Sequence, residues 1–263
     1  MKGILTRTTH ILAAGAVLLI AAQVPVRAQG RGGAPGGGPP PTGRAAASAD
    51  LAGYYVSVVT EDWRFRMVTP QKGDYASVPL NAAARALADT WDPARDEAAG
   101  EQCRSYGAAA LMRIPGRIHI AWQDDNTLKV ETDAGTQTRL FHFNGSQPQG
   151  NPTWQGYSSA VWEGGARGGR GGRAGGVATG GSLKVVTSHL KPGYLRKNGI
   201  PYSANAVLTE YYSRTMEPNG DSWLIVTTIV EDPQYLTGPF VTSTNFKLQA
   251  DDAGWAPSAC ASK

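Results

Sequence analysis

The sequence lacks any apolar run long enough to cross a membrane, and it contains only two cysteines and four histidines. Its main apolar run, residues 11–22, would cover roughly 18 Å as a helix, whereas a bilayer core is ~30 Å thick. We therefore expect no membrane span. The wide spacing of Cys103 and Cys260 excludes a CxxC redox pair, a CxxCH haem site and a cysteine-rich zinc site.

The start of the chain has the order of a secretory signal peptide. Lys2 and Arg7 precede the apolar run, and Val26-Arg27-Ala28 supplies small residues where signal peptidase cleaves. We predict that residues 1–28 are removed and that the mature protein is periplasmic or secreted. In such an oxidising compartment we expect a Cys103–Cys260 disulfide, the alternative being two separate thiols.

Positive charge is concentrated outside the expected folded part. The formal net charge is +4 at pH 7, and loss of the three basic residues in the signal leaves about +1. Five further arginines lie in glycine-rich tracts, at positions 31, 44, 167, 170 and 173. Without them the folded part carries about −4, which argues against nucleic acid as a partner.

Composition divides the mature chain into four segments. Residues 29–49 are rich in glycine, proline and alanine and predict a disordered tether. Residues 50–250 predict one folded domain, which a glycine/arginine tract at 164–181 interrupts as an expected disordered loop. Residues 251–263 are the expected C-terminal tail.

Short runs of alternating apolar and polar residues, separated by turn residues, predict a mainly antiparallel β-sheet. The nine runs are Gly53–Val59, Arg117–Trp122, Leu128–Thr132, Gln137–Phe143, Tyr157–Trp162, Leu183–His189, Val207–Arg214, Trp223–Val230 and Phe240–Leu248. So many strands in one domain favour a closed barrel of about eight or nine strands, which leaves no exposed edge. A two-sheet sandwich is the alternative.

One or two short helices are expected beside the strands. Residues 81–91 contain helix formers and no breaker, and Asp92-Pro93 followed by Gly100 supplies the N-cap, first-turn proline and terminal glycine of a second helix. Because Trp223–Val230 is apolar on both faces, we expect a helix to cover its outer face.

Several motifs occur together in the second half of the chain. In order they are Pro152-Thr-Trp-Gln-Gly-Tyr-Ser, Val161-Trp-Glu-Gly, Ser182-Leu-Lys-Val-Val-Thr, Asn198-Gly-Ile-Pro-Tyr-Ser, Leu208-Thr-Glu-Tyr-Tyr and Glu231-Asp-Pro-Gln-Tyr-Leu-Thr-Gly-Pro-Phe. In this order they resemble a group of uncharacterised exported bacterial proteins with a lipocalin-like β-barrel. The glycine/arginine tract and Tyr211, where that group has arginine, depart from the pattern. The resemblance implies a fold and an exported location, and it supplies no catalytic residues.

Ionisable side chains on the predicted strands are the candidates for chemistry. Alternation puts Glu210 on the same face as Leu208 and Tyr212, where a buried carboxylate would need Arg139, Arg214 or a tyrosine as its partner. Three histidines remain after cleavage, at positions 119, 142 and 189, and we interpret them as polar strand residues rather than metal ligands. No motif indicates a cofactor, so we expect none.

The supply of aromatic residues favours a module that binds a small apolar ligand inside the barrel or at its mouth. The residues expected to line that site are Trp63, Trp122, His142, Trp162, His189, Glu210 and Tyr212. Two alternatives remain open. One is a barrel enzyme that uses Glu210 or His142 as acid or base, and the other is a structural or partner-binding envelope protein without a pocket.

Overall fold

The structure, a computed structural model, describes residues 41–164 and 181–262. The expected signal peptide, most of the expected tether and nearly all of the glycine/arginine tract lie outside the described residues. The described part is mainly β, with a few short helices. The barrel strands are β1 (Gly53–Val58), β2 (Arg117–Asp124), β3 (Thr127–Thr132), β4 (Thr138–His142), β5 (Tyr157–Glu163), β6 (Ser182–Ser188), β9 (Val207–Met216), β10 (Ser222–Glu231) and β11 (Phe240–Leu248).

Short helices and one hairpin make up the rest. The α-helices are α1 (Trp63–Arg66), α2 (Ala82–Ala88), α3 (Pro93–Ala98) and α4 (Ala108–Leu111). A 3₁₀ helix, η1 (Gln102–Tyr106), lies between α3 and α4, and β7 (Gly193–Arg196) pairs with β8 (Ile200–Tyr202). As the sequence predicted, Asp92 caps α3, because its side chain accepts a hydrogen bond from the backbone N–H of Ala94.

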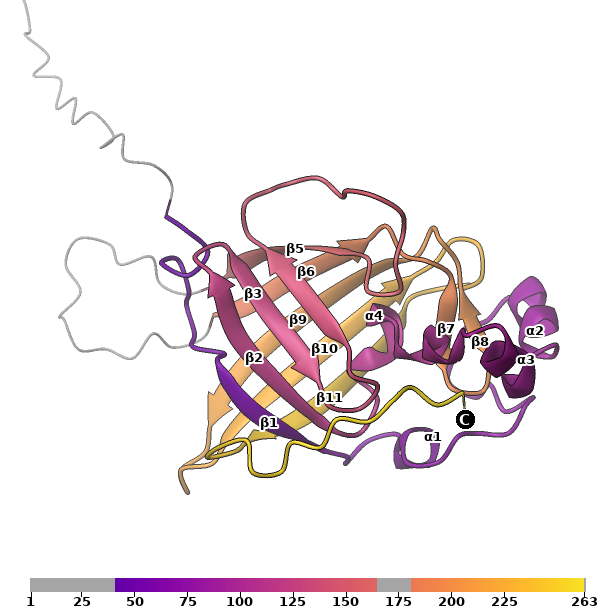
Figure 1. The fold of residues 1–263 in the computed structure, drawn as a ribbon, viewed down its shortest axis with the longest axis horizontal. Coiled ribbons are helices and arrows are strands. Elements are labelled where there is room, and N and C mark those ends of the chain that lie inside the picture. The colour runs from indigo at the N-terminus through magenta and orange to yellow at the C-terminus, as the bar shows by residue number, and fades with distance from the viewer. Residues whose placement is uncertain (1–40, 165–180, 263) are drawn as a thin grey trace, which may run out of the picture. The chain divides into compact units, whose positions relative to one another are not determined.

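The nine barrel strands close in the order β1-β11-β10-β9-β6-β5-β4-β3-β2, and β2 pairs with β1 (Figure 1). Each run that the alternating pattern predicted forms one of these strands, with some ends displaced by one or two residues. The closed barrel is confirmed, and the sandwich alternative is wrong.

The barrel is mixed rather than wholly antiparallel. Strand β5 runs parallel to β4, with Phe141 opposite Ser158. Residues 143–156 connect the two strands, and a connection of this length allows the chain to return to the same end of the sheet before β5 begins. The β7–β8 hairpin separates β6 from β9 along the chain, although these two strands are neighbours in the sheet.

The period of two in each strand sends alternate side chains into the barrel. Along β10, Leu224 and Val226 are buried, whereas Trp223 and Ile225 are only half-buried on the outer face. We expected a helix over that outer face, but β10 packs mainly against its sheet neighbours β9 and β11, whereas α2 packs on β8 and α4 on β7. The barrel core consists mainly of aliphatic side chains with Tyr55, Phe141, Tyr212 and Phe246.

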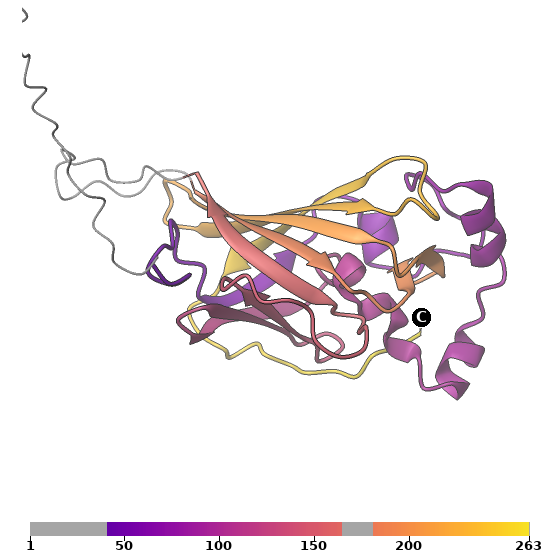
Figure 2. The same ribbon diagram turned by 90° about the horizontal axis from the view of Figure 1, so that it is seen from above.

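The helices and the β7–β8 hairpin lie at one end of the barrel (Figures 1 and 2). They form a second apolar cluster, in which Ala84 and Ala88 of α2 pack with Ile200 of β8 and with Leu208 and Val230 from the ends of β9 and β10. The elements that the described chain adds to the barrel strands are therefore concentrated at this end.

Segments outside the expected domain boundaries also contact the barrel. The Gly43 N–H donates to Asn126 Oδ1 at 2.9 Å, and the Gly43 carbonyl accepts from Trp162 Nε1 at 2.9 Å. Towards the C-terminus, Trp255 packs edge-on against Tyr54. The folded body therefore begins before Asp50 and includes most of the expected tail.

Candidate functional site

Three of the seven predicted ligand-binding residues lie outside the barrel interior. Trp63 on α1 is 66 % exposed. His142 is on the outer face of β4, where it stacks on Tyr157 with ring centroids 5.0 Å apart, and burial lowers its pKa below the ordinary value. His189 lies after β6, with Nε2 2.9 Å from the Gly150 carbonyl.

Trp122 and Trp162 form a separate aromatic group with Phe143. Their ring centroids lie 5.3 Å and 6.0 Å from that of Phe143. All three pack partly buried against the barrel core. We therefore interpret these three rings as part of the core packing. The segment around Gly43 contacts them, since the Gly43 carbonyl accepts a hydrogen bond from Trp162.

Glu210 and Tyr212 do lie together, inside the barrel, with the predicted partner Arg139. Arg139 binds the carboxylate with two hydrogen bonds, Nη1 to Oε1 at 2.9 Å and Nη2 to Oε2 at 2.6 Å. The Tyr212 hydroxyl donates to Oε1 at 3.2 Å, and Thr187 Oγ1 accepts from Arg139 Nη2 at 3.1 Å. This buried ion pair confirms that Glu210 faces inward with a basic partner.

Charge compensation in this pair is nearly complete. Burial alone would lower the pKa of Arg139, but the charge of Glu210 and its hydrogen bonds raise that pKa above the ordinary value. Burial and the same carboxylate raise the pKa of Tyr212 well above its ordinary value. We interpret the network as structural, because both carboxylate oxygens are engaged and neither ionised side chain is accessible to solvent.

A different group of arginines surrounds a cavity at the helical end of the barrel. Arg66, Arg113 and Arg196 line this cavity of about 300 Å³, which we call the arginine pocket. The remaining walls come from the end of α1, from η1 and α4, from the β3–β4 turn and from β7. They include the apolar side chains of Phe65, Met67, Val68, Ile114 and Leu195.

Two of the three arginines have carboxylate partners. Arg66 Nη1 donates to the Glu61 carboxylate, and Arg66 Nε donates to the Arg113 carbonyl at 2.8 Å. Arg113 Nη2 lies 3.2 Å from Asp62 Oδ2, but neither Nη1 nor Nη2 of Arg113 makes a hydrogen bond within the described residues. The partners Glu61 and Asp62 are themselves partly exposed, so these pairs are only partly buried.

Arg196 has no carboxylate partner among the residues that the structure describes. It is only 3 % exposed, and Nη1 donates to the Ala76 carbonyl at 2.7 Å. Its Nε and Nη2 are buried without a hydrogen-bond partner. The guanidinium carbon lies 4.1 Å from the centroid of the Phe65 ring, so a cation–π contact offsets part of the cost of burying this charge.

The positive charges in the pocket destabilise one another. Burial, together with the nearby charge of Arg113, lowers the pKa of Arg196 to about 10. Burial also lowers the pKa of Arg113 and of Arg66, although Asp62 and Glu61 oppose the effect. A negative charge in the pocket would reduce this repulsion.

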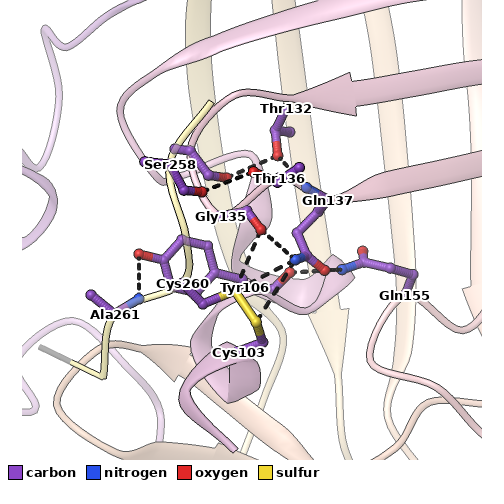
Figure 3. Close-up of a disulfide and its surroundings, with 11 residues drawn as sticks. Cys103, Tyr106, Thr132, Gly135, Thr136, Gln137, Gln155, Ser258, Cys260 and Ala261 are labelled. Carbon is purple, nitrogen blue, oxygen red and sulfur yellow. Dashed lines mark hydrogen bonds between the residues drawn. A yellow bond between two sulfur atoms is a disulfide. The ribbon is translucent and has the colours of Figure 1, made fainter. Parts of the chain in front are cut away.

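The disulfide fixes one wall of the arginine pocket. Cys103 and Cys260 are bonded, as the sequence predicted. Figure 3 shows that the bond lies beside Tyr106, whose hydroxyl accepts a hydrogen bond from the Ala261 N–H at 3.3 Å and whose carbonyl accepts from Gln155 Nε2 at 2.8 Å. Since Tyr106 lines the pocket, the covalent link joins the C-terminal segment to the pocket wall.

Sequence reasoning missed all three pocket arginines, because they lie far apart in the chain. The sequence contains only a weak signal that these arginines are buried. Arg66 and Arg113 each have apolar residues on both sides, and Arg196 follows Leu195. The motifs that carried the resemblance have structural roles where they meet, since the Asp232 carboxylate accepts from the Ser203 N–H at 2.6 Å and from the Ser203 hydroxyl at 2.7 Å.

In comparisons with known proteins, no family model, no curated protein and no solved structure matches this chain. Within residues 41–164 and 181–262, no group of three or more histidine, cysteine, aspartate or glutamate side chains is arranged to hold a metal ion. No helix in the same residues combines the length and the apolar character needed to cross a membrane.

Proposed function

We propose that this protein is a lipocalin-like binding module for a small amphiphilic anion, held at the helical end of the barrel in the arginine pocket. One observation carries the proposal: Arg196 is buried, has two unpartnered nitrogen atoms and lacks a carboxylate partner in the described residues. Buried charges are otherwise paired, so an anionic ligand would supply the missing partner.

The apolar part of the proposed ligand follows from the other walls of the pocket. Phe65, Met67 and Leu195 surround the arginines, and a volume of about 300 Å³ is at the lower end of the range for small-molecule sites. A short-chain carboxylate or an aromatic acid has the required combination of a charged group and a small apolar body.

The sequence favoured an apolar ligand in the barrel interior or mouth, and the mouth is now the better supported position. The interior contains the Arg139–Glu210 pair and large side chains such as Tyr55 and Phe246, which are almost completely buried. Catalysis by Glu210 is less well supported than binding, because both of its carboxylate oxygens are engaged by Arg139.

We also propose that the protein works in the periplasm or outside the cell. The Cys103–Cys260 disulfide supports this location, because disulfides persist in oxidising compartments.

Binding of octanoate, compared with 1-octanol and inorganic phosphate, tests the proposed function. We expect octanoate to raise the melting temperature of the mature protein and 1-octanol to have little effect, since only the carboxylate pairs with Arg196. The Arg196→Met variant should lose the octanoate effect, whereas Arg85→Gln, a charge loss on the exposed face of α2, should retain it.

Equal stabilisation by octanoate and 1-octanol would contradict a charged site. Stabilisation by phosphate as strong as that by octanoate would show that the apolar walls contribute nothing. If Arg196→Met bound octanoate like the original protein, the arginine pocket would not be the site.

A further inference from the structure

A second cavity is lined by other residues of β7 and η1 and has a different chemical character. It has a volume of about 590 Å³ and lies between the α2–α3 region, η1 and the β7–β8 hairpin. Four aromatic residues line it: Trp91, Tyr194, Tyr202 and Tyr235. We call it the aromatic cleft.

Trp91 of the aromatic cleft packs directly against the backbone of Gly199. Gly199 has a φ of +81°, and a Cβ added there would lie 2.3 Å from Trp91 Cβ and Cγ. Only glycine therefore allows Trp91 to pack this closely on the β7–β8 turn. The result is a fixed aromatic side chain in the wall of the cleft.

Two polar groups of the cleft residues are unsatisfied. Within the described residues, Trp91 Nε1 and the Tyr202 hydroxyl are buried without a hydrogen-bond partner. Tyr202 has no exposed surface, and its hydroxyl packs against Gly107 and Gly193, so an occupant of the cleft would not reach it. Buried polar groups in native proteins are almost always paired, so the unpartnered Trp91 N–H favours an occupant that offers a hydrogen-bonding oxygen.

The charges in the cleft are nearly balanced and already engaged with one another. Arg104 Nη1 lies 3.0 Å from Asp96 Oδ1 and 3.3 Å from Glu101 Oε2. The Tyr194 hydroxyl donates to Asp96 Oδ2 at 3.0 Å, and Lys191 Nζ binds Glu101. An ionic ligand would gain little here, in contrast to the arginine pocket, because each buried charge among the described cleft residues has a counter-charge.

From these observations we infer that the aromatic cleft binds a neutral saccharide composed of linked hexopyranose rings. The face of an aromatic ring is electronegative and attracts the weakly positive C–H groups on one face of a sugar ring. Sugar hydroxyls both donate and accept hydrogen bonds, so they suit the indole N–H and the carboxylates of the cleft. The inference is independent of the proposed function, which concerns another cavity.

Calorimetric titration of the mature protein with three neutral trisaccharides tests this inference. Maltotriose, cellotriose and triacetylchitotriose cover α-linked, β-linked and acetamido-bearing rings. We expect at least one to bind with a Kd below about 10 mM. The Trp91→Ala variant should weaken that binding at least tenfold, and Trp91→Phe, which retains a ring but lacks the N–H, should weaken it less.

Two matched variants serve as controls. Trp63→Ala removes an exposed tryptophan outside the cleft and should leave saccharide affinity unchanged. Arg196→Met should also leave it unchanged, so that failure of the anion site and failure of the saccharide site are distinguishable. Absence of binding by all three sugars, or an equal loss in Trp91→Ala and Trp63→Ala, would overturn the inference.

Discussion

The barrel interior and the helical end each bury an arginine, and the two arginines differ in how their charge is compensated. Arg139 lies against Glu210 with two hydrogen bonds, and its pKa is raised. Arg196 is almost as inaccessible, but it makes one hydrogen bond to a carbonyl and its pKa is lowered to about 10. Arg139 therefore has a full counter-charge inside the fold, whereas Arg196 has none among the described residues, and this difference supports the proposed anion site.

The largest expected effect comes from breaking the compensated pair. Glu210→Gln leaves Arg139 buried without an anion, so we expect a loss of about 3–5 kcal/mol in the free energy of unfolding, measured with urea. Replacing both residues by methionine should recover most of that loss, because no charge then remains buried. A loss below about 1 kcal/mol in Glu210→Gln would contradict a structural role for the pair.

Removal of the disulfide should lower both the stability of the fold and the affinity of the arginine pocket for octanoate. Cys103→Ser opens a link between residues 157 apart, and we expect a loss of about 2–4 kcal/mol in the free energy of unfolding. Octanoate binding should weaken as well, because Tyr106 lines the pocket beside the broken bond. Unchanged octanoate affinity in folded Cys103→Ser protein would show that the C-terminal segment does not support the pocket.

Octanoate affinity should follow the protonation of the Arg196 side chain as the pH changes. With a pKa of about 10, Arg196 is charged at neutral pH and loses its proton as the pH rises. We expect constant affinity between about pH 7 and 9, followed by a fall of up to tenfold per pH unit above about pH 10. Calorimetry on Arg85→Gln, which should still bind octanoate, should show the same fall, and a fall that starts near neutral pH would assign the dependence to another group.

The smallest expected effect is on the unliganded stability of Arg196→Met. Removing an uncompensated buried charge should change the free energy of unfolding by about 1 kcal/mol or less, since lost contacts to Ala76 and Phe65 are offset by relief from burial. A loss as large as that in Glu210→Gln would mean that both arginines serve the fold, and the comparison would fail.

The barrel was predictable because its information is local. Alternation in runs such as Phe240–Leu248 located every barrel strand, and the inward side of Glu210 followed from the same period. The parallel pairing of β4 with β5 was not predictable, since residues 143–156 contain no signal for the end of the sheet to which the chain returns.

The candidate site was not predictable, because it depends on contacts between distant segments. Arg66, Arg113 and Arg196 come together only through the packing of α1, α4 and β7 at one end of the barrel. Aromatic residues were the stronger signal in the sequence, but Trp122 and Trp162 pack around Phe143 and Trp63 is exposed. Residue type alone does not distinguish packing from binding.

Strands β5 and β6 provide a practical way to attach the protein to a surface. Glu163 pairs with Ser182 at the ends of these strands, and the other end of β6 leads through residues 189–192 into β7 and the two cavities. A peptide tag inserted between residues 164 and 181 would therefore leave the strand pairing intact. Sensor chips loaded through such a tag would present the helical end, with both cavities, to dissolved ligands.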